Sequence, residues 1–186
     1  ETLDIVRQVA AERIRDELFK MMESAKPSIA IEAMRDTGLL EAVLPELLEG
    51  YGVAQNEFHM HDIYYHNLYA CDAAPADKPL VRFAALLHDI GKKRAMENAQ
   101  RRTGADETVF HNHEMIGMRM ANAILRRLKF SNSDREHIMH LIKHHMFHYT
   151  DEWTDGAVRR LIRNVGLENL PDLFELRRAD RIGNGK

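Results

Sequence analysis

Apolar residues recur at helical spacing along nearly the whole chain. Between residues 12 and 22, for example, they fall at Ile14, Leu18 and Met21/Met22. This period places them on one face of an amphipathic helix. Nowhere does the sequence alternate apolar and polar residues over the length of a strand. The pattern predicts an all-α protein, and a sheet of three or more strands would contradict it.

Capping and breaking residues set the expected helix boundaries. We expect helices over residues 12–22, 28–37, 39–48 with a break at Pro45, 62–74, 80–90, 113–128, 133–145, 156–165 and from about 170 onward. The polar stretch 92–109 lacks this periodicity and is expected to form a long loop. Gly50-Tyr51-Gly52 is a natural linker. It divides a small helical neck, residues 1–52, from a multi-helix body, residues 53–186.

Composition narrows the class of protein. The 186 residues are 45% hydrophobic and 30% charged, as in ordinary soluble domains. The formal charge of −3 gives no general attraction to nucleic acid, so any RNA contact needs a local basic patch. One cysteine, Cys71, excludes an internal disulfide and suits a reducing cytoplasm. No apolar run is long enough to cross a bilayer, and we expect a cytoplasmic protein without a membrane partner.

Histidine supplies the first sign of chemistry, because all 11 histidines lie between His59 and His148. His88-Asp89 ends an apolar helix and is followed by Ile90-Gly91-Lys92. An imidazole and a carboxylate together suit Mn, Fe, Co or Mg better than structural zinc. Lys92 could then reach an anionic substrate. A His-Asp pair is common by chance, so its surroundings must decide its role.

Helical phase indicates which other polar residues point inward. His145 shares a face with Ile138 and Leu141, and His113 and Asp180 likewise lie on apolar faces of their helices. Each could be a hydrogen-bonded core residue, but a buried carboxylate needs a partner or a metal. The opposite stripe is expected to face water: His137, His140, His144 and His148.

Two further features have competing interpretations. His66 lies four residues after the capping Asp62, and a histidine in such a position, taken alone, is more often structural than a ligand. The basic run Arg159, Arg160 and Arg163 is typical of a solvated helix face, although it could also contact phosphate or RNA.

The order of these motifs resembles the HD phosphohydrolase superfamily. In combination, the segments GVAQNEFHMHDIYYHNL, RFAALLHDIGK, FHNHEMIG, RLKFSN, WTDGAVRRLIRNVG and ELRRADRIG resemble the C-terminal part of bacterial tRNA nucleotidyltransferase/poly(A) polymerase-like proteins. In the neck, ERIRDELFKMM and LLEAVLPEL resemble the part of that family associated with nucleotide and RNA binding. The resemblance covers nearly all of the chain.

The resemblance implies a ligand set. It assigns one divalent metal to His66, His88, Asp89 and Asp180. Members with two metals add two histidines, which correspond to His113 and His145, with Asp89 bridging. His144 competes for the last place, and helical phase favours His145. The cofactor would be one or two ions of Mn, Fe, Co, Ni or Mg. Family members often have proline after the HDIGK lysine where this chain has Lys93, so the following segment could differ.

Two functions follow from the resemblance. The first is hydrolysis of phosphomonoesters or phosphodiesters, including those of nucleotides, with Asp89 orienting water and Lys92 offsetting phosphoryl charge. The alternative is a non-catalytic module that binds tRNA on behalf of a nucleotidyltransferase head. The paired catalytic carboxylates of that head do not occur in these 186 residues, so we expect this chain alone not to add nucleotides.

Overall fold

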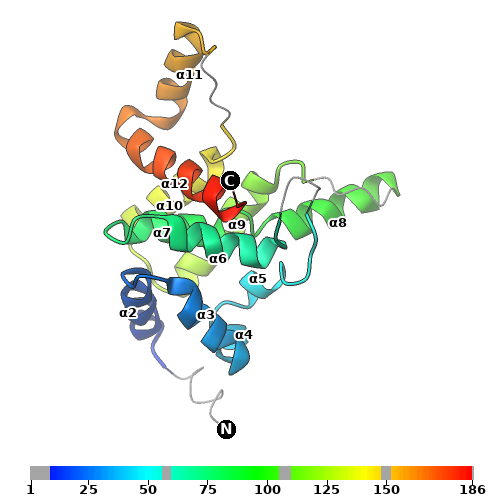
Figure 1. Ribbon diagram of the computed structural model, residues 1–186, viewed down its shortest axis with the longest axis vertical. Coiled ribbons are helices and arrows are strands. Elements are labelled where there is room, and N and C mark those ends of the chain that lie inside the picture. The colour runs from blue at the N-terminus through cyan, green and yellow to red at the C-terminus, as the bar shows by residue number, and fades with distance from the viewer. Residues whose placement is uncertain (1–8, 56–59, 105–109, 148–151, 186) are drawn as a thin grey trace.

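The computed structural model describes residues 9–55, 60–104, 110–147 and 152–185. Helices account for the regular structure throughout these ranges, and no strand occurs in them, which confirms the all-α prediction (Figure 1). The elements are α2 (Ala11–Met22), α3 (Pro27–Asp36), α4 (Leu39–Val43), α5 (Pro45–Leu48), α6 (Ile63–Ala73), α7 (Pro79–Leu87), α8 (Lys92–Thr103), α9 (His113–Arg127), α10 (Asn132–His144), α11 (Asp155–Val165), the 3₁₀ turn η1 (Leu167–Asn169) and α12 (Leu170–Gly183).

Side-chain caps fix the start of three of these helices. Asp62, Ser131 and Thr154 each accept a hydrogen bond from the backbone N–H three residues later, at 2.7, 3.0 and 3.3 Å. These bonds satisfy donors that the first turn of a helix would leave free. The expected break at Pro45 is also present, because α4 ends at Val43 and α5 begins at the proline.

The expectation of a loop over residues 92–109 is wrong for its first part. Residues Lys92–Thr103 form helix α8, which ends at Gly104 in the left-handed conformation, with φ of 68°. Lysine, arginine, alanine, glutamate and glutamine all favour helix, so the segment needs no wide apolar stripe. Ala95, 2% exposed, is its buried apolar residue. Residues 105–109 lie outside the described ranges.

Neck and body share one hydrophobic core. Leu18, Met22 and Ile31 of the neck belong to the same cluster of buried side chains as Leu86 and Ile124 of the body. The neck helices α2 and α3 pack against α7 and α6 (Figure 1). Apolar contact across the whole boundary therefore holds the two parts in one arrangement.

A buried arginine adds polar bonds across the same boundary. Arg82 of α7 is 3% exposed, and its guanidinium donates to the carbonyl oxygens of Ala74, Met22 and Ser24 at 2.9, 2.5 and 2.5 Å. Met22 is the last residue of α2, and Ser24 follows two residues later. The arginine thus ties the end of the first neck helix to the body.

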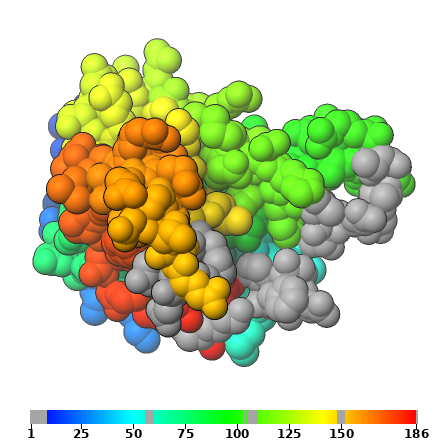
Figure 2. Space-filling view, turned by 90° about the horizontal axis from the view of Figure 1, so that it is seen from above, coloured from blue at the N-terminus to red at the C-terminus, as the bar shows by residue number. Residues whose placement is uncertain are grey.

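Two helices extend away from the rest of the molecule. Figure 1 shows α8 and α11 projecting from the packed body, and α8 also stands out at the side of the molecule in Figure 2. Within the body, α6 packs against both α7 and α12. Among the described residues, none of the helices combines the length and apolarity that a membrane span requires.

Candidate metal centre

Five helices or their ends bring six ligand-type side chains together. α6 packs against both α7 and α12, and α10 packs against α7 and α9. All six side chains lie in buried positions, with residue exposures between 0 and 7%. They are His66, His88, Asp89, His113, His145 and Asp180.

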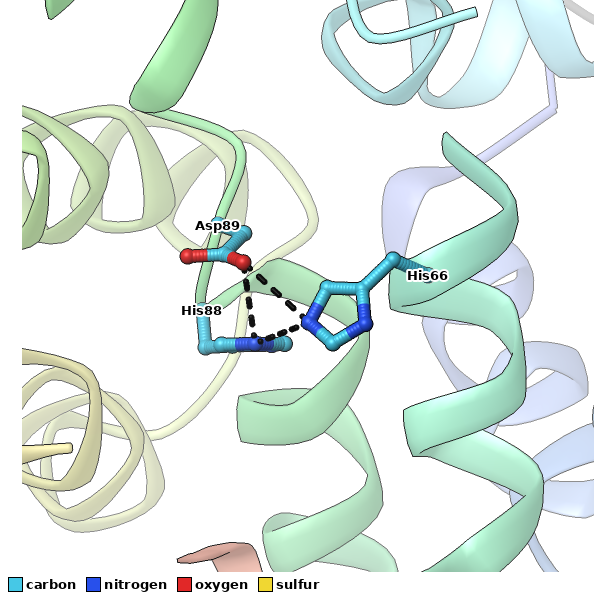
Figure 3. A group of neighbouring side chains, drawn as sticks. All are labelled: His66, His88 and Asp89. Atoms are coloured by element: carbon cyan, nitrogen blue, oxygen red, sulfur yellow. Dashed lines mark hydrogen bonds and ion pairs between the residues drawn. The ribbon is translucent and has the colours of Figure 1, made fainter. Parts of the chain in front are cut away.

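The first group lies where α6, the end of α7 and α12 meet. His66 Nε2 is 3.2 Å from Asp89 Oδ2, 3.2 Å from Asp180 Oδ1 and 3.1 Å from His88 Nε2. His88 Nε2 is 3.3 Å from Asp89 Oδ2 and 3.6 Å from Asp180 Oδ1. Figure 3 shows His66 and His88 pointing at each other and at the Asp89 carboxylate. Each of these atoms thus faces the same small space.

The second group uses the other oxygen of the same carboxylate. His113 Nε2 is 3.2 Å from Asp89 Oδ1, and His145 Nε2 is 3.6 Å from it. The two Nε2 atoms are 3.3 Å apart. Oδ1 is buried and makes no well-aligned hydrogen bond within the described part of the chain. Asp89 therefore belongs to two three-residue groups, one with His66 and His88 and one with His113 and His145, and each group could hold an ion.

The spacing of the donor atoms fits a coordination shell. Atoms about 2.1 Å from a common centre lie roughly 3.0–3.4 Å from one another in octahedral or tetrahedral geometry. The distances in both groups run from 3.1 to 3.6 Å. Four imidazoles and two carboxylates make a nitrogen-rich mixed set, which suits Mn, Fe, Co or Ni more than Mg.

Backbone carbonyls fix the orientation of three imidazoles. Nδ1 of His88, His113 and His145 lies 2.6, 2.8 and 2.7 Å from the carbonyl oxygen three residues earlier. A carbonyl only accepts, so each Nδ1 carries the donated proton. The Nε2 lone pair of the neutral ring is then directed into the cluster, as in histidines that bind metal ions.

The charges in the first group stabilise one another. Burial alone would lower the pKa of His88, but the carboxylates of Asp89 and Asp180 raise it to about 10. Burial alone would raise the pKa of Asp89, but His88 and Lys92 hold it well below its ordinary value. The pKa of Asp180 is likewise lowered, against the effect of burial, by hydrogen bonds from His66 and His88. Without a metal, a proton on His88 supplies positive charge that this site needs.

Lys92 lies inside the site. Its ammonium group is 2.6 Å from Asp89 Oδ2 and donates to Gln55 Oε1 at 2.6 Å. The residue is 6% exposed, and its Nζ lies 5.3 Å from the centre of the Phe110 ring. A buried cation on the same oxygen that faces His66 and His88 is positioned to meet a second anion, such as a phosphoryl group.

Arg177 is a site residue that the sequence interpretation missed. Its guanidinium donates to Asp180 Oδ2 at 2.6 Å, from one turn earlier on α12. Oδ1 of the same carboxylate faces His66, so Arg177 fixes the orientation of Asp180. The spacing of three residues on a helix is a signal that could have indicated this pair.

The predicted phosphate-contact residues Arg159, Arg160 and Arg163 do not join this cluster. They are exposed on α11, which packs mainly against η1 and projects from the body (Figure 1). Nothing in the arrangement directs them at Asp89.

The prediction that the outer histidine stripe of α10 faces water is wrong for the three residues described. His137 and His140 are half-buried and bind Asp172 Oδ2 at 2.9 Å and the Val165 carbonyl at 2.7 Å. His144 is also half-buried, and burial with the nearby His140 and Lys143 lowers its pKa to about 4. Helical phase cannot show that α12 and the last residue of α11 cover this face. His148 lies outside the described residues.

Comparison with known proteins agrees with this arrangement. Residues 54–185 match the family described as "HD domain", and residues 2–50 match the one described as "Probable RNA and SrmB- binding site of polymerase A". The chain therefore belongs to the HD domain family, whose members bind divalent metals. The expected resemblance to bacterial tRNA nucleotidyltransferases is confirmed as well.

The relatives include an A-adding tRNA nucleotidyltransferase and multifunctional CCA proteins. The chain is 35% identical to an A-adding tRNA nucleotidyltransferase of Deinococcus radiodurans, over 97% of its length. It is 35% and 31% identical to multifunctional CCA proteins of Ralstonia nicotianae and Legionella pneumophila, over 91% and 88% of its length. It spans only 44, 39 and 39% of these three relatives.

Proposed function

We propose that the HD domain of this chain is a divalent-metal-dependent phosphohydrolase that acts on phosphomonoesters or phosphodiesters. The observation that carries the proposal is the pair of three-residue groups joined through Asp89, with donor atoms at coordination spacing. His66, His88, Asp89 and Asp180 would hold one ion. His113 and His145 would hold a second, with Asp89 shared. A bound divalent ion supplies a Lewis acid for the phosphoryl group and lowers the pKa of water.

The remaining chemistry is assigned to two residues. Asp89 orients the attacking water, because its carboxylate lies at the centre of the cluster. Lys92 offsets the negative charge that develops on the phosphoryl oxygens. Its ammonium is already desolvated, which strengthens such an interaction. We expect the substrate phosphate to compete with Gln55 for it, since Gln55 is its neutral partner.

RNA binding is a second function, and one observation favours it. The match of residues 2–50 to an RNA-binding family covers almost the whole neck. The name of one relative, an A-adding tRNA nucleotidyltransferase, also includes tRNA. We propose that tRNA or another RNA is a partner of this chain, with Arg159, Arg160 and Arg163 as additional contacts. RNA binding and phosphoester hydrolysis can coexist, because the arginines of α11 lie outside the buried cluster.

Metal analysis together with a phosphoesterase screen tests hydrolysis. The protein is purified with Mn, Co or Ni, and its metal content and hydrolysis of bis(p-nitrophenyl) phosphate and p-nitrophenyl phosphate are measured. His88→Ala and Asp89→Asn should lose both metal and activity. His111→Ala is the matched control, because His111 is exposed and lies outside both groups. A metal-loaded chain with no hydrolysis on either substrate would favour the RNA-binding module alone.

The second ion requires its own variant. If His113 is a ligand, His113→Ala should lose one of two metal equivalents together with activity. If it contacts substrate phosphate instead, the variant should keep its metals and mainly raise KM. Two equivalents fully retained would refute the dinuclear assignment.

A further inference from the structure

Positive charge is concentrated on two neighbouring helices. The whole chain has 26 lysines and arginines against 29 aspartates and glutamates. In contrast, apart from the buried Lys92, α8 and α9 together carry seven lysines and arginines and two glutamates. A locally basic surface on a net acidic protein is the arrangement that a polyanion partner requires.

The two helices form a groove between them. It has a volume of about 590 Å³, and its lining includes Lys93, Arg94, Arg101 and Arg119. Ile116, Met120 and Ala123 of α9 contribute its apolar part. Lys93 and Arg101 are eight residues apart on α8, which corresponds to roughly 12 Å along the helix. That length faces several phosphates of one nucleic-acid strand.

Part of this charge is not neutralised within the protein. Arg94 pairs with Glu49 at 2.6 Å, and Arg101 lies 3.9 Å from Glu97. Lys93 and Arg119 have no ion-pair partner in the part of the chain that the structure describes. Both line the groove, one from each helix, so they could bind an anion from opposite sides.

The position of α8 is hard to explain by stability alone. The helix is polar nearly all round, and Figure 2 shows it extending with the start of α9 (green) as a lobe beside the body. Of its residues, Ala95 is the buried apolar one. A helix of this kind contributes little core, which points to a role at its surface.

The groove also adjoins the neck. Glu49, which lines it, lies at the end of the segment that matches the RNA-binding family, residues 2–50. We infer that the groove between α8 and α9 binds the phosphodiester backbone of RNA and extends the RNA contact of the neck onto the HD domain. The inference rests on the RNA partner of the proposed function and is independent of hydrolysis.

Fluorescence anisotropy with a 5′-labelled tRNA transcript tests this groove. The full chain is titrated at several salt concentrations between 50 and 200 mM. The double variant Lys93→Glu/Arg119→Glu should bind at least about tenfold more weakly. The slope of log K against log salt should also fall in magnitude by about 1.4, since each lost phosphate contact on a single strand accounts for roughly 0.7.

Three controls distinguish RNA binding in the groove from a general effect of net charge. Arg135→Glu/Arg178→Glu makes the same change in net charge outside the groove and should retain the affinity within about twofold. Lys93→Arg/Arg119→Lys keeps both charges and should bind as the parent does. Thermal unfolding checks the fold, and Lys93→Gln/Arg119→Gln replaces the double glutamate variant if that one is unstable.

The outcomes decide the inference clearly. Equal losses in the groove variant and in Arg135→Glu/Arg178→Glu, or no loss in either, would overturn it. A parent chain that binds no tRNA would also overturn the inference. The same holds if the groove variant binds tRNA normally and loses only binding to phosphatidylserine vesicles, which would indicate an anionic membrane as the partner. Hydrolysis of bis(p-nitrophenyl) phosphate by the parent chain is measured separately, so an inactive HD site and an unused groove give different results.

Discussion

Gly91 follows the His88-Asp89 pair, and its missing side chain lets α9 approach the end of α7. A Cβ built on Gly91 would overlap the carbonyl oxygen of His113 and would lie 2.5 Å from the backbone nitrogen of Gly117. Both obstacles are backbone atoms, so no side chain can rotate away. The two segments would have to separate by about 1 Å to reach ordinary van der Waals distance.

We therefore predict that Gly91→Ala damages both stability and the second group of ligands. Overpacking of this kind costs roughly 1–3 kcal/mol. A displacement of about 1 Å also exceeds the roughly 0.5 Å within which a binding constellation must be held. His113 begins α9 and would move away from Asp89, so the ion shared by His113 and His145 should be lost first.

The assay compares thermal unfolding and bound Mn in Gly91→Ala and Gly117→Ala. Gly117→Ala is the matched control on the opposite side of the same contact, where a Cβ would lie 3.3 Å from the His88 carbonyl oxygen and 3.5 Å from the Gly91 nitrogen. It should need only small adjustments and should bind more Mn than Gly91→Ala. Equal Tm and equal metal content in the two variants would refute the reasoning.

Three further results are expected. First, because the pKa of His88 in the metal-free chain is raised to about 10, a metal ion must displace its proton, and affinity for Mn should rise about tenfold per pH unit below that value. The same raised pKa stabilises the metal-free fold fully below pH about 6.5, and this stabilisation is lost as the pH rises to about 10. A Mn affinity that does not change with pH would contradict the raised pKa, and with it both expectations. Second, Arg82→Met leaves three carbonyls without their donor and should lower the free energy of unfolding, measured by urea denaturation, by about 3 kcal/mol. A loss below about 1 kcal/mol would contradict the role of Arg82 in holding the neck to the body. Third, Arg177→Gln should weaken Mn binding about tenfold in calorimetric titration, because Asp180 loses the bond that orients it; unchanged affinity would exclude this role.

The fold class and the identities of the inward-facing polar residues could be predicted from the sequence. Helical period placed His113 and His145 on buried faces and separated them from the exposed His111 and the half-buried His144. Capping residues located three helix starts to within a residue. Both kinds of information are local, because side-chain direction and hydrogen bonding within one turn depend on neighbouring residues.

Helix α8 shows where apolar periodicity fails to predict a helix. Its sequence lacks the apolar stripe by which helices are recognised, yet it folds as a helix whose buried apolar residue is Ala95. Intrinsic propensity and a glycine at its end were the relevant signals. The groove that α8 forms with α9 could not be predicted for the same reason, since a loop has no fixed face.

The amino-acid sequence by itself determined which residues can bind a metal and which face of each helix they occupy. Only the tertiary structure decided that Asp89 presents Oδ2 to His66 and His88 and Oδ1 to His113 and His145. It also decided that Asp172 of α12 and Val165 at the end of α11 bind His137 and His140. Periodicity gives the direction of a side chain about its own helix axis. The crossing of five helices, set by close contacts such as Gly91 with Gly117, determines which of those directions meet.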